Sequence, residues 1–530
     1  MASLALGETV VGVAQPPART RLIILASSLG SMFEWYDFFV YGALAAVLGG
    51  LFFPSGNPTA ALLKSLATFG AGFGVRPLGA IVFGRLGDMI GRKRTFLVTI
   101  ALMGGATVAV GLLPTYALAG VWAPVLLVGC RLVQGLALGG EYGGAAIYVA
   151  EHSPPARRGF QTSFIQGSIT GGFLLSLGVV LATQGAMTKA EWLAWGWRIP
   201  FLVSMLMLAG SLYIRMQLHE SPVFAAMKAR GECAKAPLRE SFATWANIRA
   251  MLVVGIGVSA GLTVIYYCAE FYSLYFLGAM QVGEVETKWL VALPIAAIAP
   301  FVVFFGWLSD HVGRKPVQLA GYGLTLLLLF PAFHQVARGA NPALAEAAAR
   351  APVVVTGADC RYDVFAKVQA TPCGRVLDQL ARRGVSYAKQ SGPGLNLRVG
   401  PERVVADPAA IDAALARAGY PTHADPARID AWRIGLAIFA LGLLSASTVG
   451  AVAAILVESF PARIRYTSIS LPYHIGTGYF GGFLPFVTQY IVARTGDAFA
   501  GLWYVWGVVA VAFVVTAVGL PETRGRDVTR

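Results

Sequence analysis

The chain has 530 residues, of which 56% are hydrophobic and 13% are Asp, Glu, Lys or Arg, about half the charged fraction of an ordinary soluble domain. A mean hydropathy of +0.64 excludes a disordered chain and an ordinary cytosolic enzyme, and indicates apolar helices in a bilayer. The net charge of +14 is compatible with binding to nucleic acid, with binding to anionic lipid, or with the basic excess that orients membrane proteins. The positions of the charges along the chain distinguish these three explanations.

Apolar stretches of the length that crosses a bilayer, about 20 residues, occur twelve times in two sets of six. The first set covers 22–48, 61–84, 95–113, 124–149, 160–183 and 199–217. The second set covers 250–277, 287–308, 316–336, 432–457, 467–493 and 499–520. We therefore expect an all-α membrane protein, with one six-helix bundle in 1–217, a cytoplasmic linker in 218–249, and a second bundle in 250–337 and 431–530.

Basic residues gather in the even-numbered connections between these stretches. They are Arg92, Lys93, Arg94, Arg157, Arg158, Arg314, Lys315, Arg463 and Arg465, with further lysines and arginines in the linker. The bias predicts that these connections and both termini are cytoplasmic. It accounts for much of the net charge, so we expect lipid, protons and a small molecule as partners, no nucleic acid, and a monomer.

Two internal repeats relate the halves. Residues 84–94 match 306–316 at six of eleven positions with an offset of 222, and the weaker pair 151–158 and 458–465 has an offset of 307. The difference of 85 residues predicts an insert between the ninth and tenth helices, at 338–430, in an external connection.

The pattern of the insert indicates a small α/β domain. We expect strands at 353–355, 395–399 and 403–406, and helices at 375–383 and between Asp407 and Gly419, where Asp407-Pro408 supplies a start signal. Cys360 and Cys373 lie in this external segment, where a disulfide is permitted; two free thiols are the alternative. No cysteine motif indicates a metal site, and we expect no cofactor.

The stronger repeat places an aspartate and an arginine at matching turns of both halves. Asp88 and Arg92 form the first pair and Asp310 and Arg314 the second. Each turn can hold a carboxylate and a guanidinium in one hydrogen-bonded patch, so we interpret the four residues as a conformational latch; a solvated loop is the alternative.

Several motifs resemble the major facilitator superfamily and, within it, the metabolite:proton symporters. The general ones are the two repeated loops, Arg131-Leu-Val-Gln-Gly135 and Pro521-Glu-Thr-Arg-Gly525; the more specific ones are Phe33-Glu-Trp-Tyr-Asp-Phe-Phe-Val-Tyr-Gly42, Val75-Arg-Pro-Leu-Gly79, Gly139-Gly-Glu-Tyr-Gly143 and Glu220-Ser-Pro-Val-Phe224. The resemblance implies two six-helix bundles that alternate access to a central site in the inner membrane of a bacterium. Relatives carry organic acids, shikimate or zwitterions, and the long external insert departs from the smaller members.

Charged residues inside the spans are costly and need a reason. Glu34 and Asp37 share a face of the first helix, and a buried carboxylate can carry a proton; bracing helix packing with Arg76 is the alternative. Arg131 and Glu141 in the fourth helix are candidates to tune the proton site, or else a fixed structural pair.

The candidate substrate site centres on Arg76, beside Pro77, which bends the second helix. Glu270 in the seventh helix and His474 in the eleventh are further candidates, although a lone intramembrane histidine can equally serve packing. Tyr36 and Gln134, from the motifs above, complete the set.

Taken together, these features predict a secondary active transporter that imports a small polar metabolite, an organic anion, with protons. The alternatives are a solute sensor with an external ligand-binding cap, and an antiporter or facilitator of the same fold. No nucleotide-binding G-x-x-x-x-G-K-S/T motif occurs, which disfavours a pump driven by ATP, and no catalytic constellation indicates an enzyme.

Overall fold

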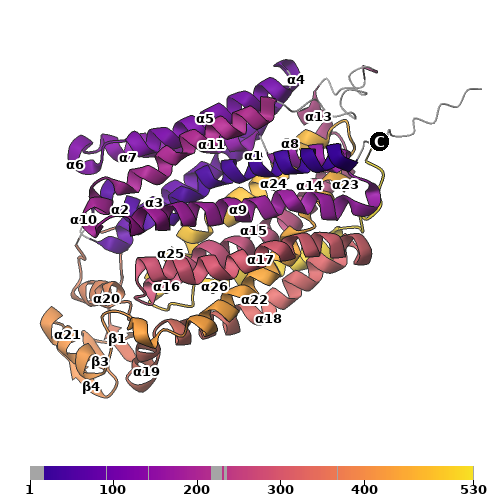
Figure 1. The fold of residues 1–530 in the computed structure, drawn as a ribbon. Helices are drawn as coiled ribbons and strands as arrows, with labels where there is room; N and C mark the ends of the chain where they lie inside the picture. The colour runs from indigo at the N-terminus through magenta and orange to yellow at the C-terminus, as the bar shows by residue number, and fades with distance from the viewer. Residues whose placement is uncertain are drawn as a thin grey trace, which may run out of the picture.

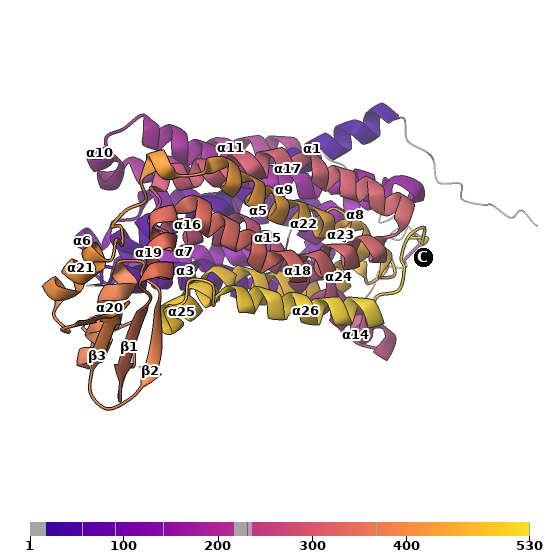
Figure 2. The ribbon, with the colours of Figure 1, turned by 90° about the horizontal axis from the view of Figure 1, so that it is seen from below.

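The computed structural model describes residues 17–55, 57–90, 92–140, 142–216, 230–231, 236–366 and 368–528. Long helices run side by side, with a small α/β insert at one end and the C-terminal end of the chain at the other (Figures 1 and 2). We call these the insert end and the latch end; the latch end contains residues 151–158, 310–314, 458–465 and 522–528.

In the described part of the chain, nine helices are long and apolar enough to cross a membrane, or ten when the bent pair 24–43 and 45–52 is one span. The shorter apolar helix 97–112 and the rod from Arg465 to Thr495 occupy the two remaining positions of the expected twelve. The structure is thus the all-α membrane protein that the sequence predicts.

The first half begins with a helix that bends after Ala43. Its elements are α1 (Pro17–Ala43), α2 (Ala45–Phe52), α3 (Pro58–Gly74), α4 (Arg76–Ile90), α5 (Arg92–Leu112), α6 (Tyr116–Ala119), α7 (Trp122–Gly139), α8 (Tyr142–Glu151), α9 (Arg158–Gly185), α10 (Lys189–Ala194) and α11 (Ile199–Met216), with 3₁₀ turns η1 (Pro155–Arg157) and η2 (Gly196–Arg198). The predicted second helix breaks at Val75, so that Arg76 is the first residue of α4. The predicted fourth helix divides into α7 and α8.

The second half contains three π-helical segments, which the apolar pattern does not reveal. Its elements are α13 (Pro237–Ser241), α14 (Trp245–Leu252), η3 (Val253–Ala260), α15 (Gly261–Tyr267), η4 (Cys268–Tyr272), α16 (Ser273–Ala279), α17 (Glu284–Val312), α18 (Arg314–Ala340), α22 (Ala431–Val449), α23 (Val452–Glu458), α24 (Arg465–Ile475), η6 (Gly476–Gly482), α25 (Leu484–Thr495) and α26 (Leu502–Gly519). Of these, η3, η4 and η6 are the π-helical segments, a conformation that is frequent at functional sites.

The halves meet along α9 with α17, α4 with α24, and α3 with η6. Two glycines of η6 make this contact close: a methyl group at Gly482 would collide with the ring of Phe73, and one at Gly478 would lie 2.9 Å from the Phe73 carbonyl oxygen. Small residues at such positions let helix backbones approach in a membrane. Phe73, three residues before Arg76, is thereby fixed at the interface between the halves.

The insert is a four-stranded sheet with the order β2-β1-β3-β4. Its elements are α19 (Pro342–Arg350), β1 (Val353–Gly357), α20 (Pro372–Arg382), β2 (Tyr387–Ser391), β3 (Asn396–Val399), β4 (Glu402–Val404), α21 (Pro408–Arg417) and η5 (Pro426–Arg428). β1 pairs with β2 in parallel (Val353 opposite Tyr387) and with β3 antiparallel (Val353 opposite Val399). Cys360 and Cys373 form a disulfide that ties the β1–α20 connection to the first turn of α20.

The insert bonds to both halves. On the second half, the Tyr387 N–H donates to the Gly496 carbonyl (3.1 Å) and the Ala424 N–H donates to the Gln281 carbonyl (3.0 Å). On the first half, the Asn57 side-chain amide donates to the Tyr362 hydroxyl (3.1 Å) and to Asp378 Oδ1 (3.0 Å). The insert therefore bridges the halves at one end of the bundle.

Asn57 has two functions in this bridge. Its Oδ1 accepts from the N–H groups of Thr59 and Ala60 and caps α3, while its amide reaches the insert. Burial raises the pKa of Tyr362 to about 12, so the hydroxyl stays protonated and donates to Asp378 Oδ1 (3.2 Å). Each group of this junction thus has a defined donor or acceptor role.

Candidate functional site

Two fully buried guanidinium groups lie in the middle of the bundle. Arg76, at the start of α4, and Arg131, in α7, each have 0% exposure. The Arg76 Cζ atom lies 3.6 Å from the ring centroid of Phe73 and 4.5 Å from that of Phe38. The Arg131 Cζ atom lies 4.3 Å from the ring centroids of Phe38 and Tyr41. Both cations therefore stack on one aromatic cluster and share Phe38, an arrangement that stabilises buried positive charge.

Arg131 is held by a short polar chain. Its Nη1 donates to Gln134 Oε1 (2.6 Å), and Gln134 Nε2 donates to Thr107 Oγ1 (2.6 Å) on α5. Gln134 is a predicted substrate residue, and the structure places it as the group that positions Arg131.

Three residues of the second half lie near Arg76. Tyr267 of α15 and Tyr473 of α24 lie within electrostatic range of Arg76, and His474 lies beside Arg76 and the Gly139 backbone. The ring of Tyr267 also contacts that of Phe73, with 5.6 Å between centroids. Residues from both halves thus meet near the arginines.

Among the described residues, no carboxylate forms an ion pair with Arg76 or Arg131, and the Nε and Nη2 atoms of both have no hydrogen-bond partner. A buried charge without a counter-charge costs several kcal/mol, about 3–5 when a partner is removed. An anion that enters this space would supply the missing negative charge and the missing acceptors.

The predicted carboxylates are buried separately from the arginines. Asp37 is 4% exposed with Oδ1 unpartnered, and Glu34, one turn before it, is 5% exposed. Glu270, in the π-helical segment η4, is 2% exposed, and its Oε2 has no partner. The space around Glu270 is lined by Tyr266, Thr170 and apolar side chains of α17 and α22.

The remaining predicted site residues are placed differently or lie outside the described residues. The Tyr36 hydroxyl donates to the Pro200 carbonyl (2.6 Å), so it joins α1 to α11. Glu141 lies outside the described residues, and of Asp88 and Arg92 only the backbone is described.

The latch end is closed by two reciprocal ion pairs between the halves. Arg158 Nη1 lies 2.9 Å from Glu458 Oε1, and Arg465 Nη1 lies 3.0 Å from Glu151 Oε1. All four side chains are at most 4% exposed. Glu151 and Arg158 occupy the same repeat positions as Glu458 and Arg465, so each glutamate pairs with the arginine of the other half.

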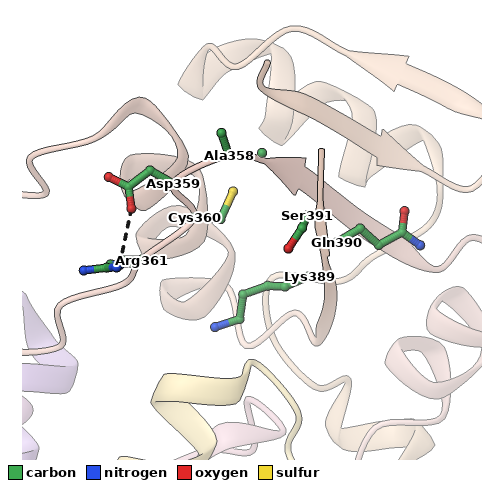
Figure 3. Close-up of a pocket in the computed structure, with 8 residues that line it drawn as sticks. Ala358, Asp359, Cys360, Arg361, Lys389, Gln390 and Ser391 are labelled. Carbon is green, nitrogen blue, oxygen red and sulfur yellow. Dashed lines mark ion pairs between the residues drawn. The ribbon is translucent and has the colours of Figure 1, made fainter. Parts of the chain in front are cut away.

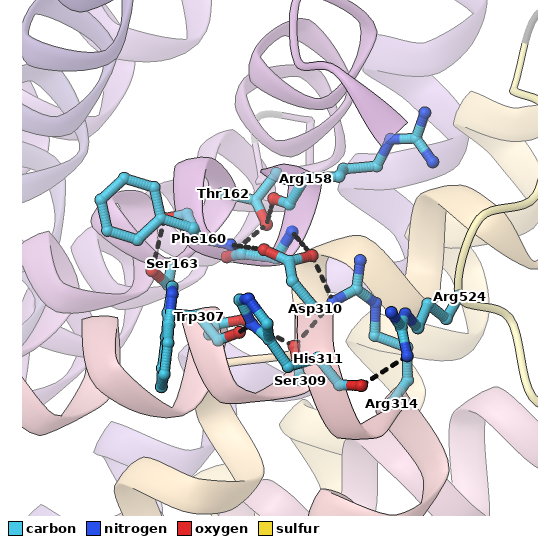
Figure 4. Close-up of polar contacts among 12 residues, drawn as sticks. Arg158, Phe160, Thr162, Ser163, Trp307, Ser309, Asp310, His311, Arg314 and Arg524 are labelled. Carbon is cyan, nitrogen blue, oxygen red and sulfur yellow. Dashed lines mark hydrogen bonds and ion pairs between the residues drawn. The ribbon is translucent and has the colours of Figure 1, made fainter. Parts of the chain in front are cut away.

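Asp310 and Arg314 belong to the same network (Figure 4). Their side chains pair at 2.7 Å, and Asp310 accepts hydrogen bonds from the N–H groups of Gly159 (2.9 Å) and Phe160 (2.7 Å) in the first turn of α9. Arg314 also lies 3.3 Å from Glu458. The second copy of the repeated loop therefore contacts the first half directly.

Glu522 joins the C-terminal segment to this network. It accepts from the N–H groups of Arg314 (3.0 Å) and Lys315 (3.2 Å) at the start of α18. Partial burial alone would raise the pKa of Glu522, but hydrogen bonds from backbone N–H groups, including those of Arg524, Arg314 and Lys315, outweigh it and lower the pKa. The glutamate is thus held ionised at a helix N-terminus.

A polar depression on the insert lies at the carboxyl ends of β1 and β2 (Figure 3). Asp359 and Arg361 form an ion pair there (3.5 Å), with side chains 63% and 93% exposed. Lys389 reaches the Arg494 carbonyl. Because these charges are solvated and mutually paired, the depression offers no desolvated binding group.

Sequence reasoning missed the cross-paired glutamates and the insert junction. The sequence does contain a signal for the cross-paired glutamates, because the weaker repeat aligns Glu151 with Glu458 and Arg158 with Arg465. The signal for the second was limited to the start sequence Asn57-Pro58, which predicts a helix cap and not a contact 305 residues away.

The known proteins that this chain matches are membrane transporters and not enzymes. A model of the sugar (and other) transporter family matches residues 22–244. The inner membrane metabolite transport protein YhjE of Escherichia coli K12 is 36% identical over 328 residues, which cover 61% of this chain and 74% of that protein.

Two other relatives from Escherichia coli K12 give similar values. The proline/betaine transporter is 37% identical, and the match covers 59% of this chain and 64% of that protein. The shikimate transporter is 36% identical, and the match covers 60% of this chain and 72% of that protein. The fold matches the partially occluded inward-open xylose transporter XylE from E. coli with a TM-score of 0.60 at 16% identity, over 96% of this chain and 100% of that one. The chain belongs to the major facilitator superfamily, in the family of these metabolite transporters.

Proposed function

We propose that this protein imports a small organic anion together with protons by alternating access, with the insert end outside and the latch end in the cytoplasm. The observation that carries the proposal is the pair of fully buried guanidinium groups of Arg76 and Arg131, which no described carboxylate neutralises. The ring faces beside them are already occupied by the two cations, which favours an anionic ligand over a cationic one.

Proton coupling rests on the carboxylates. An ionised carboxylate buried without a cation is costly, so Asp37 and Glu270 must bind a proton or gain a partner when they leave water. We assign proton coupling to Glu34, Asp37 and Glu270 in the presence of Arg131, and substrate contact to Arg76 with His474 nearby. The even-numbered basic connections support the orientation.

Contacts between the halves at both ends of the bundle support alternating access. Ion pairs join the halves at the latch end, and at the insert end the Tyr275 hydroxyl donates to the Gly42 carbonyl (3.0 Å). One set of contacts must break while the other forms. The latch contacts would then open toward the cytoplasm, and the insert-end contacts toward the outside.

The test is uptake into proteoliposomes with the pH lowered on the side of the insert. Shikimate, succinate and benzoate are compared with proline and glycine betaine, and Arg76→Gln and Arg131→Gln with Arg198→Gln. Arg198 also stacks on an aromatic ring, that of Trp197 at 4.3 Å, but lies outside the central cluster. We expect the pH gradient to drive accumulation of a carboxylate, both central variants to abolish it, and Arg198→Gln to retain it. Accumulation of the zwitterions alone would contradict the anion assignment.

A further inference from the structure

The loop that the disulfide closes, residues 360–373, contacts both halves of the bundle. On the first half, the Tyr362 hydroxyl accepts a hydrogen bond from the side-chain amide of Asn57, the residue that caps α3 (3.1 Å). On the second half, the ring of Phe365 stacks on that of Tyr490 in α25, with 6.3 Å between the ring centroids. We call residues 360–373 the strap, because this one loop crosses from one half to the other at the insert end.

The rest of the insert is joined to the second half. The chain enters the insert from α18 and leaves it into α22. At the start of the insert, the Asn341 side-chain amide donates to the Met280 carbonyl (3.0 Å). At its end, the Asp430 N–H donates to the Gly339 carbonyl (2.9 Å). The insert therefore moves with the second half, and its bonds to Asn57 must break when the halves separate at this end.

Side chains of the bundle also join the halves at the insert end, but they are more exposed. Gln184 of α9 donates to Glu284 Oε2 (3.2 Å) and accepts from Lys288 Nζ (3.1 Å), both on α17. The bond to Glu284 is exposed, so water can replace it. Asn57 is 1% exposed, and one of its two acceptors is the Asp378 carboxylate (3.0 Å). Because breaking a buried bond to a charged group costs more than breaking an exposed one, the strap contributes strongly to closure of this end.

The disulfide fixes the two groups that bind Asn57. Cys360 lies two residues before Tyr362, and Cys373 lies in the first turn of α20, the helix that carries Asp378. The disulfide thus ties the loop that bears the hydroxyl to the helix that bears the carboxylate. Without it, the strap would keep the two hydrogen bonds between the Gln369 side chain and the loop backbone, but it would lose its covalent link to α20.

One cysteine of the disulfide is partly exposed. Cys373 is 5% exposed, whereas Cys360 is half-buried and lines the open depression at the carboxyl ends of β1 and β2 (Figure 3). Two of the three charged side chains that line the depression, Arg361 and Lys389, are cations, and positive charge favours the approach of an anionic thiolate. Thiol–disulfide exchange requires access of this kind and no desolvated binding group.

We propose that the strap is an external latch that holds the insert end closed, and that thiol–disulfide exchange at Cys360 releases it. A thiolate of an external dithiol attacks the Cys360 sulfur, the bond to Cys373 breaks, and its electron pair remains on the Cys373 sulfur. The second thiolate of the dithiol then displaces Cys360, so the dithiol becomes a cyclic disulfide and both cysteines are reduced. The two protons of the dithiol pass through water to the two cysteine thiolates. The inference rests on the alternating access of the proposed function and does not depend on the substrate.

The test is the distance between two fluorophores at the insert end, measured on the full chain in lipid nanodiscs without substrate. The fluorophores are attached to azide-bearing residues introduced at Ala117 of α6 and Arg338 of α18, exposed positions of opposite halves, so that no thiol is labelled. Dithiothreitol should raise the ratio of long-distance to short-distance molecules about tenfold, the size expected when a hydrogen bond to a charged group is lost. Cys360→Ser with Cys373→Ser should show the raised ratio without the reagent and should not respond to it.

A second variant tests the Asn57 junction while the disulfide stays intact. Asn57→Asp keeps the cap of α3 and places a carboxylate against Asp378, so it should raise the same ratio about tenfold or more, and dithiothreitol should then add little. The matched control is Asn341→Asp. Asn341 also caps a helix, α19, and is 1% exposed, but its amide bonds to Met280, which moves with the insert, so the ratio should not change.

Three results would overturn the external latch. They are an unchanged ratio after complete reduction of a folded insert, an unchanged ratio in Asn57→Asp, and a response to reduction that is equally large in Asn57→Asp, because the disulfide would then act elsewhere. If reduction unfolds the insert, Asn57→Asp and its control still decide whether the strap holds this end closed. If the unmodified protein takes up no carboxylate while both distance changes persist, the proposed function fails and the latch remains.

Discussion

Glu458 is the residue whose charge holds most of the latch. Its carboxylate lies 2.9 Å from Arg158 and 3.3 Å from Arg314, and accepts from the Thr523 hydroxyl at 2.9 Å. Glu458→Gln keeps the size and removes the charge. Arg314 would still pair with Asp310 at 2.7 Å, so only Arg158 would lose its carboxylate.

The size of the effect of Glu458→Gln follows from the single arginine that loses its carboxylate. Removing one partner of a buried ion pair costs about 3–5 kcal/mol, and the lower figure applies because one arginine is affected. About 3 kcal/mol corresponds to a shift of roughly 150-fold in the ratio of latch-open to latch-closed molecules. The matched control is Glu346→Gln, whose pair with Arg428 (3.2 Å) is solvated on both sides and is worth about 0–1 kcal/mol.

The assay is the distribution of distances between spectroscopic labels introduced at Ala156 and Val312, which are exposed positions at the latch end of opposite halves. Glu458→Gln should add a population with a longer distance, and Glu346→Gln should not. An unchanged distribution in a folded Glu458→Gln protein would refute the claim that these pairs hold the latch end closed.

Three other predictions concern the insert and the C-terminal segment. Cys360→Ser with Cys373→Ser opens a loop with a separation of 13 residues and should lower the stability of the insert by about 3 kcal/mol, measured by amide hydrogen exchange. Asn57→Asp keeps the cap of α3 but places a carboxylate against Asp378, 3.0 Å from the present amide, and should increase hydrogen exchange at this junction through repulsion. Despite partial burial, hydrogen bonds from backbone N–H groups lower the pKa of Glu522 in the folded protein. The ionised side chain therefore stabilises the folded protein fully above its ordinary pKa of 4.5. This contribution to the free energy of unfolding should be lost as the pH falls through the lowered pKa.

Each of these has a control. Cys130→Ser removes a thiol that is not in a disulfide and should leave exchange in the insert unchanged; equal protection with and without the disulfide would contradict the first prediction. Asn57→Ser retains a capping group and adds no charge. If hydrogen exchange at the junction increases equally in Asn57→Ser and Asn57→Asp, repulsion from Asp378 is not the cause. In Glu522→Gln the acid-dependent loss measured at the start of α18 should disappear, and its persistence would assign the effect to another group.

The fold was largely predictable because its signals are local. Apolar stretches gave the spans, and Asp407-Pro408 predicted the start of α21, which the structure places at Pro408 with the Asp407 side chain as its cap. Gly419 takes a positive φ of 84° after that helix, as a helix-ending glycine should. β2 was missed because it is an edge strand in which Tyr387 alone is buried, so it lacks an apolar alternation.

The π-helical segments and the direction of Tyr36 could not be predicted. A π-helical turn differs from an α-helical turn by one residue, a change that the apolar pattern between Val253 and Tyr272 does not record. Tyr36 belongs to a motif of the first helix, but the partner of its hydroxyl, the Pro200 carbonyl, is set by packing 164 residues away.

The sequence allowed the residues of the candidate site to be predicted better than the contacts between them. Arg76 and Arg131 stand out as costly charges in apolar helices, and the structure brings both onto Phe38. The pairing of Glu458 with Arg158 crosses 300 residues, and a repeat can show that two positions are equivalent without showing that they meet in reciprocal pairs.

The most direct test of the central claim is proton movement during uptake of a carboxylate. Proteoliposomes that enclose a pH-sensitive dye are mixed with the transported carboxylate in the absence of an imposed gradient. We predict that the interior acidifies as the carboxylate enters, and that Arg76→Gln abolishes both signals. Entry of the carboxylate without acidification, or entry that persists in a folded Arg76→Gln protein, would contradict proton-coupled anion transport through the buried arginines.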